Sequence, residues 1–219
     1  MSSSKTSNER AAGKRRVPRQ TRSIERVERI LDVAGRLVVE QGVDALTTKA
    51  VADLAGMPVA SLYQYFADKD EILLALVERD VAEMDAEVQA DLGQLEVLSI
   101  GSIVETTMRA FVKVYLRRPA FVVIWLRGRT NTAISEFCRA HNKRVAADLF
   151  RLAHDAGLVR RGTRPLHAEL AVEVGDRVFQ LAFETRMRGD RAIVAEGIEL
   201  VRSYLERHAT ASGIEGVRR

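Results

Sequence analysis

The segment TTKAVADLAGMPVASLYQYFADKDEIL, residues 47–73, constrains the fold of this chain more than any other feature. Thr47 or Thr48 is placed to cap a short helix, and Gly56 supplies the positive φ angle that a tight turn between two helices needs. Pro58 then begins a second helix, because a proline at the first helical position loses no hydrogen bond. The pattern predicts a helix-turn-helix, a unit that fits the major groove of DNA.

The two helices of this unit differ in what they expose. We expect the first helix to turn four apolar residues inward: Val51, Ala52, Leu54 and Ala55. The second helix, residues 59–65, is only about two turns long and buries Leu62 and Phe66. It leaves hydroxyls and an amide available on its other face: Ser61, Tyr63, Gln64 and Tyr65. Such groups can hydrogen-bond to base edges and phosphates.

Nine residues of this region follow a known family pattern: Thr47, Ala55, Gly56, Met57, Leu62, Tyr63, Tyr65, Phe66 and Lys69. Over about residues 24–75 the chain resembles the tetracycline-repressor (TetR) family of transcriptional regulators. Two positions depart from that family, since Pro58 stands where a Ser or Thr cap is common and Ala60 where Gly is common. The resemblance implies a homodimeric, ligand-responsive regulator, most often a repressor, bound to a palindromic operator in double-stranded DNA.

We expect ten residues to contact DNA: Thr47, Thr48, Lys49, Val59, Ala60, Ser61, Tyr63, Gln64, Tyr65 and Lys69. Tyr63 and Gln64 are assigned to base edges, and Thr48, Tyr65 and Lys69 to phosphates. The resemblance supports Lys49 as a further base contact. The alternative for Lys49 is a solvated surface lysine.

The basic charge of the chain is concentrated at its start. Residues 1–22 hold seven basic side chains and one acidic one, and they show no apolar periodicity. We therefore expect a disordered basic arm that attracts DNA over long range. The alternative is a tail that only aids solubility.

The composition indicates a cytoplasmic protein. Cys138 is the single cysteine, so an internal disulfide is excluded and a reducing compartment fits. No run approaches the roughly 18 apolar residues of a membrane span, and the first residues include basic side chains but no apolar stretch of the kind that a signal peptide needs, so we do not expect secretion. We expect an association with the bacterial nucleoid rather than with a membrane.

The rest of the pattern is helical, which predicts an all-α fold of about nine helices. The first helix, 23–40, joins the helix-turn-helix in a three-helix DNA-binding domain, 23–68, and a ligand-binding and dimerisation domain follows, 69–208. Later helices are expected at 69–92, 102–118, 132–156, from Pro165 to before Gly189, and 191–207, with a short apolar helix after Pro119. Asp68 with Glu71, and Ser102 with Glu105, are the expected capping pairs. Residues 209–219 are expected to form a flexible tail.

The last two long helices carry small residues on apolar stripes: Ala171, Gly175, Ala182 and Gly197. Small residues let helices approach closely. The family resemblance implies that this helix pair forms a four-helix dimer interface. The alternative is ordinary packing within one chain.

Aromatic and other large residues at helical spacing fall on three middle helices: Met108, Phe111, Tyr115, Phe121, Trp125, Phe137 and His141. Alone, each is more often part of a core than of a binding site. The resemblance implies a pocket in this region, so we expect these residues to bind a hydrophobic or aromatic effector. Tyr115, His141 or Arg127 is available as its polar contact. We expect the effector to wedge against helix 69–92 and tilt it.

The sequence gives little support for a catalytic site, a metal site or a cofactor-binding site. Cys138 and His141 share a helical face, but two ligands do not make a zinc site. No nucleophile elbow, phosphate loop or HExxH motif occurs. We therefore expect no enzyme and no cofactor. An architectural DNA-binding protein without an effector and, remotely, a helical enzyme remain as alternatives.

Overall fold

The computed structural model describes residues 19–127 and 132–218 of the chain. The described residues form ten α-helices, a 3-10 turn, a π-helical segment and two strands of two residues each. The all-α prediction is confirmed. The predicted arm lies, up to residue 18, outside the described residues.

The N-terminal domain consists of α1 (Arg19–Gln41), η1 (Val43–Ala45), α2 (Thr48–Ala55) and α3 (Val59–Leu62). α1 begins at Arg19, so the helix starts four residues before the expected Ser23. From Ile30 onward one face of α1 is buried, and Val51, Ala52 and Leu62 are fully buried in the same core. The small domain is therefore held by a continuous apolar interior.

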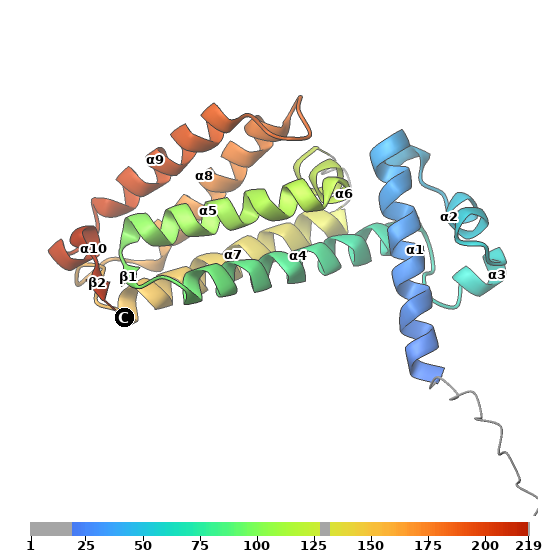
Figure 1. Ribbon diagram of the computed structural model, residues 1–219, viewed down its shortest axis with the longest axis horizontal. Helices are drawn as coiled ribbons and strands as arrows, with labels where there is room; N and C mark the ends of the chain where they lie inside the picture. Colours follow the sequence, from blue (N-terminus) through green and yellow to red (C-terminus); the bar gives the residue numbers. More distant parts are fainter. Residues whose placement is uncertain (1–18, 128–131, 219) are drawn as a thin grey trace, which may run out of the picture.

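The larger domain contains the remaining elements: α4 (Lys69–Gly93), β1 (Val97–Leu98), α5 (Ile100–Arg117), α6 (Pro119–Phe121), η2 (Val122–Arg127), α7 (Thr132–Asp155), α8 (Pro165–Phe183), α9 (Arg191–Glu206), α10 (Ala211–Glu215) and β2 (Val217–Arg218). Figure 1 shows α1 lying across the start of α4, which then runs lengthwise along the larger domain. The Asp68 cap holds that start, since its Oδ1 accepts from the backbone N–H groups of Asp70 and Glu71, each at 2.9 Å. Glu71 in turn accepts from the N–H of Ala67 at 2.6 Å.

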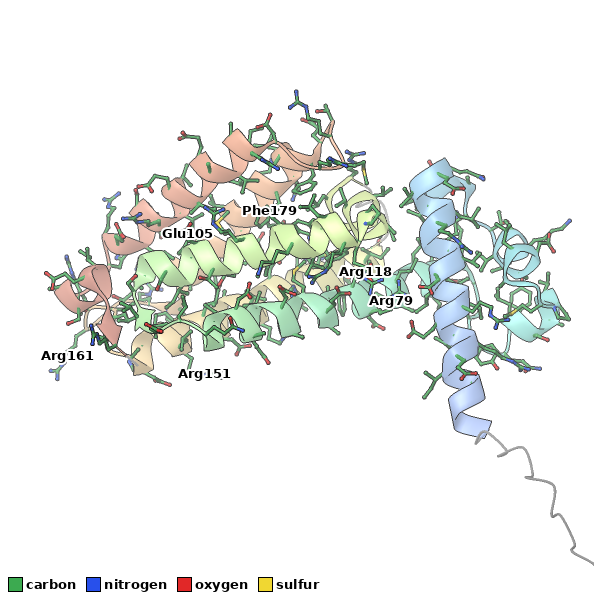
Figure 2. The ribbon with its side chains drawn as sticks, viewed as in Figure 1. Arg79, Glu105, Arg118, Arg151, Arg161 and Phe179 are labelled. Atoms are coloured by element: carbon green, nitrogen blue, oxygen red, sulfur yellow. The ribbon has the colours of Figure 1, made fainter. Side chains whose placement is uncertain are left out.

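The junction between the domains is both packed and charged. Gly35 of α1 faces α6, where an added Cβ would lie 3.6 Å from Ala120 Cβ. Arg79 of α4 bridges to Asp32 of α1 at 2.9 Å, and Figure 2 shows Arg79 and Arg118 near this junction. Asp80 is buried between these two arginines, and burial raises the pKa of its carboxyl despite their charges. Movement of α4 or α6 is thereby coupled to α1.

The expected capping box at Ser102 and Glu105 is wrong in its register. Helix α5 begins at Ile100, and its cap is Ser99, which forms a reciprocal box with Ser102. Glu105 instead pairs with Arg109 one turn later, at 2.8 Å. Ser99 and Ser102 have the same spacing as Ser102 and Glu105, so the sequence contained two competing caps.

The short apolar helix after Pro119 is only partly α-helical. Its first turn, α6, continues directly into the π-helical η2, which includes Trp125. Val122, Ile124 and Trp125 are all buried, so nearly every side of this segment contacts protein. π-Helical turns occur mostly inside α-helices and are frequent at functional sites.

The flexible tail expected at 209–219 is wrong for the described part. Thr210 caps α10, Gly213 packs directly against the backbone of Leu158, and β2 pairs antiparallel with β1. Ala209 is also buried. Short polar segments fray only when nothing holds them, and here backbone hydrogen bonds fix both ends.

Candidate DNA-binding surface and effector cavity

The turn of the helix-turn-helix has the geometry its residues require. Thr47 Oγ1 accepts from Ala50 N–H at 3.1 Å, which makes Thr47 the cap of α2. Gly56 follows α2 with φ 66° and ψ 39°, a left-handed conformation that favours glycine. Pro58 is the N-cap of α3 rather than its first residue, as its ψ of 140° is extended.

One inward residue was predicted wrongly. Val51, Ala52 and Ala55 are buried, but Leu54 is 60% exposed. At 100° per residue, Leu54 lies about 100° away from the centre of the face formed by the other three. The number of apolar residues in α2 therefore overstated the width of its buried face.

Helix α3 is shorter than the predicted 59–65. Its regular turn ends at Leu62, and hydrogen-bonded turns continue to Phe66, whose N–H donates to Leu62 O at 3.1 Å. Leu62 and Phe66 are buried as predicted, and Tyr63 is 54% exposed. The exposed residues of this helix-turn-helix are therefore held in place by buried apolar neighbours, Leu62 and Phe66.

The ten candidate DNA contacts gather around this edge. Five are exposed, namely Thr47, Lys49, Ala60, Tyr63 and Gln64, and five are half-buried, namely Thr48, Val59, Ser61, Tyr65 and Lys69. The hydroxyl groups of Thr48 and Tyr63 are 3.3 Å apart, which links α2 to α3.

Arg26 of α1 was missed in the sequence. Its guanidinium donates to Tyr65 Oη at 3.5 Å and lowers the pKa of that hydroxyl below its ordinary value. This contact joins residues 39 positions apart, so local spacing gave no signal of it.

A largely apolar cavity of about 100 Å³ lies within the larger domain. It is lined by residues of α5, α7, α8 and α9, by Trp125 of η2, and by three residues outside these elements, Val159, Thr163 and His208. Four of the seven predicted effector residues line it: Met108, Phe111, Tyr115 and Trp125. None of the described residues that line this cavity belongs to α4, so direct contact between an effector and helix 69–92 stays a prediction.

Of the other three predicted residues, Phe121 and His141 pack against Trp125 behind the wall of the cavity. Phe121 is fully buried, with its ring centroid 5.1 Å from that of Trp125. Phe137 is half-buried against the core. His141 is buried edge-on to Trp125, with ring centroids 5.6 Å apart. Periodicity placed these residues inside the domain but could not separate the wall from the layer behind it.

His141 connects the cavity wall to α4. Its Nε2 lies 2.9 Å from Asp85 Oδ1 of α4, and Arg144 donates to the other oxygen of Asp85 at 2.6 Å. Burial, the largest effect, acts to raise the pKa of Asp85, but hydrogen bonds and charge from His141 and Arg144 hold it below its ordinary value. Trp125 is therefore connected to Asp85 of α4 through a single intervening side chain, that of His141.

Several polar side chains of the wall were also missed. Trp125 Nε1 donates to Asp176 Oδ1 at 3.1 Å, and Asn142 Nδ2 donates to Glu173 at 3.2 Å. Thr107 is buried, and its hydroxyl has no hydrogen-bond partner among the described residues. Thr107 lies beside Met108 and one turn before Phe111, so the spacing on α5 was a usable signal for it.

The small residues of α8 and α9 pack within the chain. A Cβ at Gly197 would lie 2.9 Å from Val178 Cγ2 and closer still to Cγ1, while Ala171, Gly175 and Ala182 are buried. The alternative of ordinary intrachain packing therefore holds for these residues. An apolar stripe nevertheless remains on the outer face of the two helices, formed by Leu166, Leu170, Val174, Leu181, Ile193 and Leu200, each at least 37% exposed.

The described part of the chain has neither a membrane-spanning helix nor a cluster of metal ligands. No helix in 19–127 or 132–218 is long and apolar enough to cross a membrane. In the same ranges no group of three or more His, Cys, Asp or Glu side chains is placed to hold a metal ion.

Known proteins share both halves of this architecture. The sequence profile described as "Bacterial regulatory proteins, tetR family" matches residues 30–76, and that described as "Tetracyclin repressor-like, C-terminal domain" matches residues 99–205. A TetR-family transcriptional regulator of known structure from Streptomyces coelicolor is 30% identical, with a TM-score of 0.68 over 84% of this chain and 98% of that one.

Two curated relatives agree with this match. The uncharacterized HTH-type transcriptional regulator YvkB of Bacillus subtilis is 23% identical over 187 residues, which cover 78% of this chain and 96% of YvkB. The HTH-type transcriptional repressor KstR of Mycobacterium tuberculosis is 37% identical over 62 residues, 28% of each chain.

Proposed function

Because this chain belongs to the TetR family of transcriptional regulators, we propose that it is a repressor released from its operator by a small apolar effector. The exposed edge of α3 supports the DNA-binding part above all. Tyr63 and Gln64 are exposed there, while Leu62 and Phe66 beside them are buried in the domain core. A reading helix needs this combination of a fixed base and exposed polar groups.

The contacts around α3 support two separate roles for the candidate residues there, one in binding base edges and one in binding phosphates. Gln64 carries the amide that suits a base edge, while Lys69 lies at the start of α4, where a cation suits a phosphate. Tyr65 already receives a hydrogen bond from Arg26, so its hydroxyl is oriented before DNA arrives. We assign Tyr63 and Gln64 to bases, and Thr48, Tyr65 and Lys69 to the backbone.

The apolar stripe on α8 and α9 supports a homodimer. A single helix-turn-helix contacts one half-site, and two half-sites about 34 Å apart give useful affinity. Large exposed apolar residues in a continuous stripe are typical of an interface. Leu170 and Leu200, 47% and 55% exposed, would lie at the centre of the four-helix contact.

The route from effector to DNA runs through Trp125. A ligand in the cavity contacts Trp125, which packs on His141 and so on Asp85 of α4. α4 enters the DNA-binding domain at Lys69 and bridges to α1 through Arg79. The distance between the two helix-turn-helix units of a dimer decides whether both fit the operator. A ligand that binds one such arrangement of the dimer more tightly shifts the dimer toward it without any covalent step.

The test is a selection of genomic DNA fragments by the purified full-length protein, followed by mobility-shift assays at several salt concentrations. We expect a palindromic operator and an affinity that falls as salt rises. Gln64→Ala should retain the helical circular dichroism spectrum but discriminate less at a few base positions of the operator, whereas Gln89→Ala, an exposed glutamine on α4, should behave as the parent.

Binding without sequence preference would support an architectural protein and contradict a repressor. Absence of salt-dependent DNA binding would contradict both.

A further inference from the structure

The effector cavity is long and narrow. Its wall follows α5 from Ile100 to Tyr115, a rise of about 22 Å at 1.5 Å per residue. One end lies at Trp125 and Asp176, and the other at the stacked rings of His167 and His208, whose centroids are 3.8 Å apart. With only about 100 Å³ open, a compact ligand would need large movements, while a slender one needs small ones.

Thr107 supplies a hydrogen-bonding group partway along this wall. Its side chain is 94% buried, given a relative exposure of 6%, and its hydroxyl is unpartnered among the described residues. A buried polar group without a partner is costly and calls for an explanation. A ligand oxygen in the cavity would satisfy it. Asn142 adds a side-chain amide to the same wall.

The charge of the wall disfavours an anion. Over the described ranges, no Lys or Arg lines the cavity, whereas the Asp176 carboxyl does. Burial, followed by the nearby His167, Arg207 and Arg160, lowers the pKa of His208, so this imidazole is a poor counter-charge at neutral pH. A carboxylate enclosed here would lose its hydration without contacting a Lys or Arg side chain of the wall.

We propose that the cavity takes a slender, uncharged apolar molecule with one hydrogen-bonding oxygen that pairs with Thr107, and that it rejects the corresponding carboxylate. This inference rests on the proposed effector site. It deepens that proposal by naming the chemical class of the effector.

The test uses 1-decanol and decanoate at pH 8, which share a ten-carbon chain and differ in charge. Trp125 is the only tryptophan and lines the cavity, so its fluorescence reports binding in the full-length protein without DNA. We expect saturable binding of 1-decanol and at least tenfold weaker binding of decanoate. Comparable or tighter binding of decanoate, or no binding of 1-decanol, would overturn the proposal.

The Thr107→Val variant removes the hydroxyl group of this side chain but keeps its shape, so it tests the hydrogen bond without altering the form of the cavity. It should weaken 1-decanol binding about five- to tenfold, the value of one hydrogen bond, and raise the melting temperature of the free protein. Thr106→Val, on the same helix but outside the cavity wall, is the matched control and should leave the affinity for 1-decanol unchanged. Equal affinities of the two variants would overturn the role of Thr107.

A mobility-shift assay with 1-decanol distinguishes failure of this inference from failure of the proposed function. A protein that binds 1-decanol but keeps its operator contradicts the effector response and leaves the ligand class standing. A protein whose operator is released by decanoate rather than by 1-decanol contradicts the ligand class and leaves the repressor standing.

Discussion

Replacing Gly197 by alanine should destabilise this protein, although alanine is the better helix former. A methyl group at Gly197 would lie 2.9 Å from Cγ2 and 3.0 Å from Cβ of Val178, and nearer still to Cγ1. Val178 is β-branched and stiff about χ1, so it cannot swing aside within α8. The two helices must separate or a side chain must leave its preferred rotamer.

The sign of the effect depends on two opposed terms. Alanine stabilises a helix by about 1 kcal/mol relative to glycine, whereas overpacking costs about 1–3 kcal/mol. The added methyl group would approach three atoms of Val178 more closely than ordinary van der Waals contact allows, so we take the upper half of the overpacking range. The expected net loss in the free energy of unfolding is about 1–2 kcal/mol. For a chain of this length the melting temperature should fall by about 3–6 °C.

Thermal melts followed by circular dichroism at one fixed protein concentration measure this change, because dimer dissociation would otherwise shift the midpoint. Gly93→Ala is the matched control, since nothing lies within 4 Å of its added Cβ, and it should be neutral or stabilising. Val178→Ala should partly rescue Gly197→Ala. Equal melting temperatures of the Gly197→Ala and Gly93→Ala variants would refute the claim that Gly197 serves packing between α8 and α9.

Three further predictions concern DNA, the dimer and pH. Gln64→Ala should reduce discrimination at a few base positions by about 1–3 kcal/mol, whereas Lys69→Ala should weaken all sequences alike and reduce the salt slope by about 1, as read from titrations on operator and random DNA. Leu170→Glu should weaken self-association at least about tenfold in sedimentation experiments, while Leu116→Glu, 50% exposed on α5 outside the stripe, should not. Because the folded-state pKa of Asp85 is lowered, its stabilisation is present above its unfolded pKa and lost as pH falls through the folded value. Asp85→Asn should therefore cost about 1–2 kcal/mol at pH 7 and flatten the loss of stability in acid, and equal denaturation curves of parent and variant at pH 7 would contradict this.

The fold was predictable where neighbours along the chain determine it. Gly56 and the Asp68 cap act within a few residues, so the helix-turn-helix and the start of α4 were found close to their true positions. The pairing of β1 with β2 could not be found in this way, because two strands of two residues carry no alternation and lie far apart in sequence. Leu54 shows a further limit, since composition counts apolar residues but the helical angle decides which are buried.

The site was predictable to a similar extent. Periodicity placed Met108, Phe111 and Tyr115 together on the face of α5 that lines the cavity, because a helix repeats its face every three or four residues. It could not show that α8 and α9 close the cavity, nor that His141 lies behind Trp125 with its Nε2 on Asp85. Those arrangements depend on how helices pack, and packing is decided by side chains from distant parts of the chain.

The pairing of Val97 with Arg218 also imposes an order on synthesis. These partners are about 120 residues apart, so β1 has no strand to pair with until the ribosome has added β2. The buried core residues of the N-terminal domain, from Ile30 to Phe66, are made first, and domains made first generally fold first. In a nascent chain the helix-turn-helix is therefore complete before the last elements of the larger domain are made, and under the proposed function any DNA binding in that interval would not respond to an effector.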